Sequence, residues 1–147
     1  MNLFLVLYIP KKGGLIVGNI KSTLQMQDLF FSEFSFAQKR SGKPKQMHTN
    51  ISVSYATKSD DKNQIKVQID LTIKDDGGEL SLFLRTIGFF KLTMEKTEDA
   101  IAEQILKKNT VSIMLPYIRS QVSLITTQPG IVPIMLQPID VNELIKD

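Results

Sequence analysis

The side chains that could act as catalytic bases or metal ligands are few in this chain. Its 147 residues include one histidine, His48, and no cysteine. Without cysteine, disulfides, thiolate nucleophiles and cysteine-bound zinc are excluded together. A lone histidine is more often a surface or packing residue than a base, because a base needs an oriented partner, and no neighbour in the sequence offers one. The sequence therefore predicts neither a His/Cys metal site nor a histidine-activated nucleophile.

Carboxylates and glycines offer the remaining chemistry, and both fall in turn-like segments. Asp60-Asp61 and Asp75-Asp76 stand where aspartate is favoured because its side chain hydrogen-bonds the nearby backbone. Gly13-Gly14 and Gly77-Gly78 lack the spacing and the following Lys-Ser/Thr of a phosphate-binding loop. No serine lies in a nucleophile elbow. No catalytic constellation can be assembled, so we expect a protein that is not an enzyme and that uses no metal or cofactor.

The charge of the chain is mildly basic. A net charge of +3 is far below the charge density of a dedicated nucleic-acid binder. One basic cluster falls in a turn-like segment and consists of Lys39, Arg40, Lys43 and Lys45. Such a cluster is typical of a solvated loop, with a contact site for an acidic partner as the alternative. Basic residues beside phenylalanines can bind single strands, but no RNA-binding motif accompanies them, so we expect no nucleic-acid partner.

The elements that position any functional surface are predicted to be strands. Apolar and polar residues alternate through the middle of the chain, which is the pattern of a strand with one buried face. The alternation is clearest from Ile65 to Ile73, and it recurs over Ile51–Tyr55 and Leu80–Leu84. Residues 59–63 and 75–78, which separate these strands, have the composition of hairpin turns. The pattern predicts consecutive antiparallel strands.

The first predicted strand, from Leu24 to Phe36, is apolar on both faces. Strict alternation places Leu29 and Phe31 opposite a set made of Leu24, Met26, Phe30, Phe34 and Phe36. In the fourth strand, Phe83 and Ile87 make the second face apolar as well. This is more apolar surface than one two-layer domain can hide, which predicts an oligomer interface or a binding groove.

The pattern becomes helical after the strands. Thr97 can cap a helix, and apolar residues at helical spacing then extend to Ile125, although Asn109-Thr110 could break the helix and Pro116 could kink it. Asp140 and Glu143 form a capping-box pair for a short last helix. Strands followed by helices predict an α+β fold: a four-stranded antiparallel sheet, a long helix that could be broken, and a short C-terminal helix.

The first 23 residues precede this domain, which we place at residues 24–147. Their apolar run, Met1–Ile9, is too short to span a bilayer, which needs about 20 residues. It also lacks the charged start and the cleavage site of a signal peptide. We expect no stable membrane insertion, and an appendage that is either poorly ordered or paired as an extra edge strand.

The segment Leu115–Arg119, with the sequence LPYIR, resembles the Phe/Leu-Pro-Tyr-x-Arg core of SecB-type export chaperones. Ile131–Ile139 is similar to the proline-rich connection into the last helix of that family. Gly88–Phe90 and Phe34–Phe36 resemble parts of its fourth and first strands. The resemblance assigns a scaffold role to Leu115, Pro116, Tyr117, Arg119, Pro133 and Pro138.

The resemblance implies a cytoplasmic chaperone, assembled as a dimer of dimers, that holds unfolded polypeptides in apolar grooves without ATP. Eight phenylalanines and six methionines suit such a surface, because adaptable apolar side chains fit varied clients and their weak contacts add along one chain. The expected client-binding residues are Phe34, Phe36, Phe83, Phe89, Phe90, Leu92 and Tyr117.

The resemblance also implies docking to the translocase motor through acidic residues on the exposed sheet surface. Glu33 stands at one such position, but Ala37 and Phe83 stand at two others, which argues against this docking. SecB-like relatives also serve as dedicated chaperones of antitoxins, so export and an antitoxin-directed role are both open. The other hypothesis keeps the fold but makes the chain an interaction or assembly module with one fixed protein partner.

Overall fold

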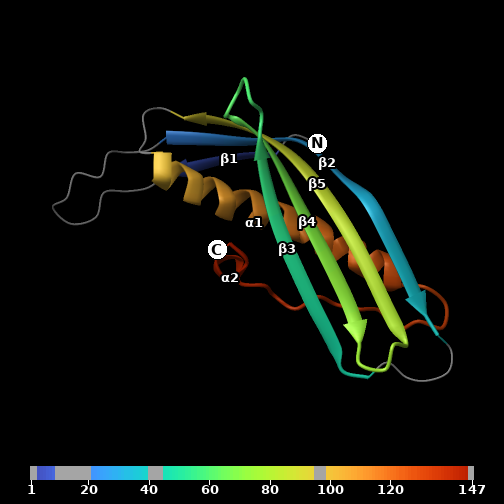
Figure 1. Cartoon of the computed structure of the whole chain (residues 1–147). Coiled ribbons are helices and arrows are strands. Elements are labelled where there is room, and N and C mark those ends of the chain that lie inside the picture. The colour runs from blue at the N-terminus through green and yellow to red at the C-terminus, as the bar shows by residue number, and fades with distance from the viewer. Residues whose placement is uncertain (1–2, 9–20, 40–44, 95–98, 146–147) are drawn as a thin grey trace.

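A single antiparallel sheet with one long helix behind it forms the framework of the chain (Figure 1). The computed structural model describes residues 3–8, 21–39, 45–94 and 99–145. The elements, in chain order, are β1 (Leu3–Tyr8), β2 (Lys21–Gln38), β3 (Met47–Thr57), β4 (Gln64–Asp75), β5 (Leu80–Met94), α1 (Asp99–Thr126) and α2 (Val141–Leu144). The strand order is β1-β2-β5-β4-β3. The predicted helix cap at Thr97 and residues 40–44 of the basic cluster lie outside the described residues.

The four predicted strands correspond to β2–β5, and two of their connections are the predicted turns. In the β4–β5 turn, the buried Asp75 carboxylate accepts hydrogen bonds from the backbone N–H groups of Leu80 (2.9 Å) and Lys45 (3.1 Å). Gly78 takes a positive φ of 70° there, a conformation in which glycine meets no Cβ clash. This turn sets the β4–β5 register, which places Asp70 opposite Arg85.

At one edge of the sheet, β1 pairs with β2, with Leu3 opposite Met26 and Tyr8 opposite Lys21. The sheet therefore has five strands in the described chain, one more than the four that alternation predicted. Because β2 begins at Lys21, it crosses the predicted division of the chain at residue 23, which stays a prediction.

Two β-bulges in β2 correct the predicted division of its apolar residues. The pairing with β5 shifts at Gln27 and again at Ser32, and each extra residue exchanges the two faces of the strand. As a result Leu29 and Phe31 share the helix side of the sheet with Leu24, Met26, Phe34 and Phe36, which pair with residues on that side of β5. Phe30, paired with Ile87, lies on the outer face instead. Strict alternation was wrong here because it assumed an unbroken ladder.

The helix α1 is continuous from Asp99 to Thr126, so the predicted break at Asn109-Thr110 does not occur, and Pro116 lies within the helix. Thr110 is buried and its hydroxyl donates to the Lys107 carbonyl (3.2 Å), which satisfies it inside the helix. A stripe of fully buried side chains faces the sheet and consists of Val111, Met114, Ile118 and Val122. The predicted α+β fold is confirmed.

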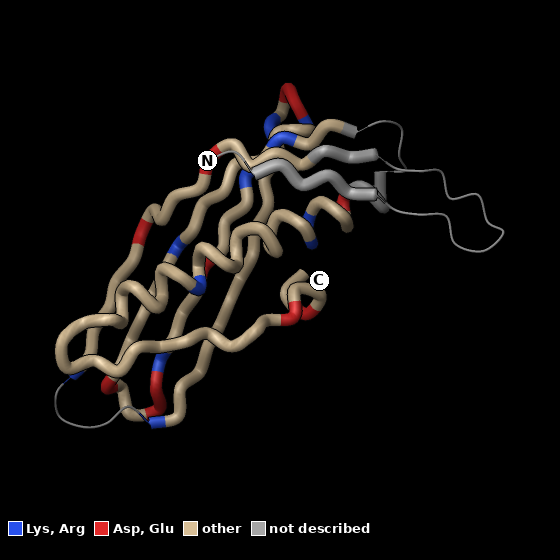
Figure 2. Tube along the Cα trace, turned by 180° about the vertical axis from the view of Figure 1, so that it is seen from behind, with Lys and Arg blue, Asp and Glu red and all other residues tan. Residues whose placement is uncertain are grey.

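The chain after α1 runs along the same side of the sheet and ends at α2, as Figure 2 shows from behind. Thr126 joins these two segments: its buried hydroxyl donates to the Val122 carbonyl (2.8 Å) and accepts from the Ile134 N–H (2.9 Å). The Asp140 carboxylate caps α2 by accepting from the Asn142 N–H (2.9 Å), as the sequence predicted. Among the described helices, none combines the length and the apolar composition that crossing a membrane requires.

Candidate functional site

The helix side of the sheet is incompletely covered along β2. Phe34 lies on this side but is 57% exposed, and Leu29, Phe31 and Phe36 are only half-buried. Leu84, paired with Phe34 on β5, is by contrast completely buried. Leu24 and Met26, near the start of β2, are buried in the core, but from Leu29 to Phe36 the core ends at β5. This part of β2 carries an apolar strip that α1 leaves open.

A second group of exposed apolar side chains lies on the same side of the sheet, at the end of α1 and beyond it. Leu124 is exposed, and Val132 and Met135 are each 77% exposed. The end of α1 lies at the same end of the sheet as the end of β2 (Figures 1 and 2). No charged residue occurs between Arg119 and Asp140. We call the β2 strip together with these three residues the helix-side apolar surface.

The residues predicted to bind clients do not form one surface. Phe34, Phe36 and the half-buried Tyr117 belong to the helix side. Phe90 is completely buried and Leu92 is almost so, because both face α1 from β5 and pack in the core. In this structure they are core side chains, which corrects their predicted role as surface contacts.

Phe83 and Phe89 lie on the opposite, outer face of the sheet. Phe89 stacks with Phe30, with ring centroids 6.3 Å apart. Phe83 lies beneath the Arg85 guanidinium, whose carbon is 5.5 Å from the ring centroid. Among the described residues, the exposed phenylalanines are thus divided between two faces.

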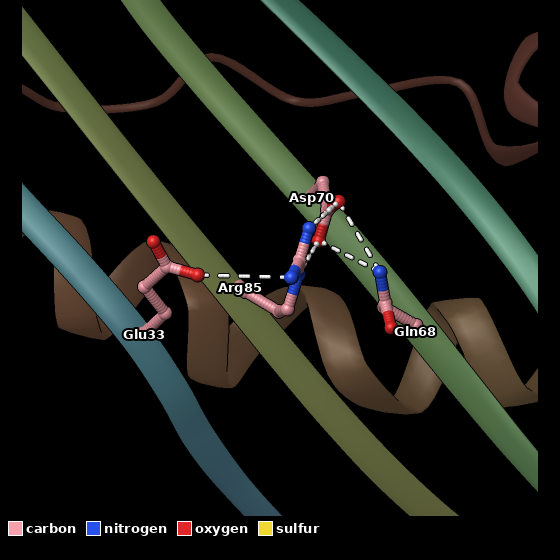
Figure 3. A network of polar contacts seen from close by, with 4 residues as sticks. All are labelled: Glu33, Gln68, Asp70 and Arg85. Atoms are coloured by element: carbon pink, nitrogen blue, oxygen red, sulfur yellow. Dashed lines mark hydrogen bonds and ion pairs between the residues drawn. The ribbon is translucent and has the colours of Figure 1, made fainter.

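A polar network crosses the middle of the outer face (Figure 3). Arg85 donates two hydrogen bonds of 2.8 Å to the two carboxylate oxygens of Asp70 and lies 3.6 Å from a carboxylate oxygen of Glu33. The Arg85 hydrogen bonds hold the pKa of Asp70 below its usual value, with a further hydrogen bond from Gln68 acting in the same direction. Glu33, the one remnant of a motor-docking site that the sequence suggested, is therefore paired within its own chain.

Sequence reasoning also missed a partner for His48. Its Nε2 atom lies 2.5 Å from a carboxylate oxygen of Asp76, because pairing of β3 with β4 brings Met47 opposite Asp75. Both side chains are more than half exposed. The contact joins the start of β3 to the residue that follows β4. The turn composition at residues 59–63 was the signal that could have found this pair, since it fixes which residues of the hairpin meet.

The predicted scaffold residues lie on α1 and the segment that follows it. Leu115 is buried and Tyr117 is half-buried against the core, and the scaffold role of these residues stays a prediction. Pro116, Arg119, Pro133 and Pro138 are exposed. Within the described residues, no three histidine or carboxylate side chains are grouped closely enough to hold a metal ion.

Comparison with known proteins explains this architecture. A family model described as preprotein translocase subunit SecB matches residues 18–147. The chain belongs to the SecB family. SecB-family chaperones are non-enzymatic, which agrees with the expectation, drawn from the sequence, that this chain is not an enzyme.

Two relatives of this SecB-family chain extend the comparison. A SecB-like chaperone of Mycobacterium tuberculosis, solved in complex with a ChAD peptide from the HigA1 antitoxin, has the same fold with a TM-score of 0.61 and 16% identity, covering 80% of this chain and 88% of that one. An uncharacterized protein of Methanocaldococcus jannaschii is 27% identical over 116 residues, which is 64% of this chain and 74% of the relative.

Proposed function

We propose that this SecB-family chain is an ATP-independent holdase that binds unfolded polypeptides through its helix-side apolar surface. The observation that carries the proposal is the exposure of Phe34, Val132 and Met135 on the helix side of the sheet. Val132 and Met135 lie in a segment, residues 120–139, that has no charged residue. Exposed apolar side chains grouped on one side of a domain are typical of an interaction site.

The free energies of apolar contacts suit the reversible binding of many different client segments. Burying one large apolar side chain is worth about 1.5–3 kcal/mol, and ordering a flexible client costs free energy at each contact. One contact alone is therefore weak. Several contacts along one extended client add, so affinity comes from length of client rather than from one deep pocket.

The same uncovered surface supports assembly of the chain. In the proposed dimer of dimers, part of the β2 strip is covered by a second copy, and the remainder lines grooves for clients. We place this assembly in the cytoplasm, where SecB-family proteins generally act.

A dedicated client, such as an antitoxin, fits this chain better than docking to the translocase motor. Motor docking needs free acidic side chains on the outer face, whereas Glu33 lies beside Arg85 and the face carries Lys66, Lys74 and Lys91. Similarity in fold to a SecB-like chaperone bound to an antitoxin peptide supports this choice.

The test is suppression of aggregation of a chemically denatured protein without nucleotide, together with the native mass of the chaperone. We expect a tetramer that protects the client at near-stoichiometric concentration and equally well with or without ATP. A strictly monomeric protein that protects no client would overturn the proposal. Recovery of one stoichiometric folded partner, with no protection of unfolded clients, would favour the fixed-partner module instead.

A further inference from the structure

The outer face of the sheet has a hollow at the end where β3 and β4 approach their connecting turn. It measures about 260 Å³, and its lining includes Lys58, Lys66, Gln64 and Phe89. Gln27, the extra residue of the first β2 bulge, completes it from the other side. Bulges commonly re-aim a side chain toward a site, and this one turns an exposed amide toward the hollow.

The hollow combines an aromatic platform with positive charge. Phe89 is 36% exposed and Phe30 is 42% exposed, and their stacked rings form an apolar step on a largely polar face. Lys66 is paired directly opposite Phe89, and Lys91 stands two residues along β5 on the same face. No carboxylate is among the described residues that line the hollow.

Outside the hollow, the charged side chains of the outer face do not extend this positive charge. Strand pairing places three described carboxylates on this face, those of Asp28, Glu33 and Asp70. It also places four basic side chains there, those of Arg85, Lys66, Lys74 and Lys91. Arg85 is engaged by Asp70 and lies 3.6 Å from Glu33, so these three groups together carry one net negative charge. Asp28 lies beside Phe89 on β2, but the lysines around the hollow outnumber it.

We propose that this hollow docks an acidic segment of a partner protein, with an apolar side chain of that segment resting on the Phe30–Phe89 pair. A carboxylate of the segment then pairs with Lys58 and Lys66. A nucleic-acid strand fits less well, because its continuous line of phosphates would pass the carboxylates of Asp28 and Glu33. The site lies on the face opposite the helix-side apolar surface, so it does not depend on the proposed chaperone function.

The test is fluorescence anisotropy of the full-length protein with a short labelled peptide rich in glutamate and phenylalanine. Its counterpart has lysine at every glutamate position. We expect the acidic peptide to bind at least about tenfold more tightly than the basic one, because like charges placed together in an interface repel each other. Binding should weaken as salt is raised.

The matched variants are Lys66→Glu and Lys74→Glu, two exposed lysines on the same face of β4. Lys66→Glu should weaken acidic-peptide binding by about tenfold or more, and Lys74→Glu by no more than about twofold. Equal effects of the two variants, or equal binding of the two peptides, would overturn the proposal. So would salt-sensitive binding of oligothymidylate without binding of the acidic peptide. Unchanged client protection by Lys66→Glu would show that the two faces act separately.

Discussion

A methyl group at Gly88 would lie 2.8 Å from Phe90 Cε2 and 2.9 Å from Met114 Sδ. Real Cβ atoms do not approach other heavy atoms so closely, so the ring of Phe90 and the Met114 side chain of α1 must both shift. At this point the absence of a side chain lets α1 approach β5, and the depth of the core depends on it.

Gly88→Ala should therefore lower the free energy of unfolding by about 1–3 kcal/mol, the usual cost of overpacking a core. Urea denaturation at one fixed protein concentration measures the change. Gly77→Ala is the control, because the nearest atom to its Cβ is 3.3 Å away on the flexible Lys45 side chain. Equal stability of the two variants would show that α1 does not pack as closely as the structure has it.

Asp75 should make stability depend on pH in the acid range. Hydrogen bonds from the backbone N–H groups, that of Leu80 foremost, hold the pKa of its carboxyl below the usual value. A depressed folded-state pKa contributes stability that is present above the unfolded-state pKa, about 3.9, and is lost as pH falls through the folded value. Urea midpoints between pH 6 and pH 2 should fall in the wild type and fall less steeply in Asp75→Asn. Asp60→Asn, at an exposed turn position, should keep the wild-type slope.

Among the elements, the segment after α1 depends on one hydroxyl. Thr126→Val keeps the side-chain shape but removes the acceptor for the buried Ile134 N–H. Leaving a buried donor unpaired costs about 1–3 kcal/mol, so unfolding should become easier by that amount and hydrogen exchange at Ile134 should accelerate. Thr127→Val is the matched control, since the exposed Thr127 hydroxyl bonds only the Ser123 carbonyl among the described contacts. If both variants behave alike, Thr126 does not anchor the segment.

The hairpins of the sheet could be predicted from the sequence, whereas the register of β2 could not. The turn at residues 75–78 fixes the β4–β5 pairing by local geometry, so Asp70 opposite Arg85 follows from it. The β2–β5 pairing instead joins segments distant in the chain and contains bulges at Gln27 and Ser32, for which alternation gives no signal. The faces of Phe30, Leu29 and Phe31 depended on those bulges.

For the whole molecule, the residue types predicted a binding surface but not its boundaries. Phenylalanines in two strands indicated excess apolar surface, and Phe34 is indeed exposed. Alternation alone could not separate Phe90, which α1 covers, from Phe89 on the outer face, because coverage depends on where a distant helix packs. The structure therefore leaves two exposed aromatic regions, one on each face, with different surroundings.

The most direct test of the account compares Phe34→Ser with Phe30→Ser, which remove exposed phenylalanines from opposite faces of β2. The measurement is the affinity of each variant, at equal native mass, for a labelled, permanently unfolded client of low net charge, by fluorescence anisotropy. We predict that Phe34→Ser weakens binding by roughly tenfold, since a buried phenylalanine is worth about 1.5–3 kcal/mol, and that Phe30→Ser changes it by less than about twofold. Unchanged affinity in Phe34→Ser, or an equal loss in Phe30→Ser, would contradict the claim that the helix-side apolar surface holds clients.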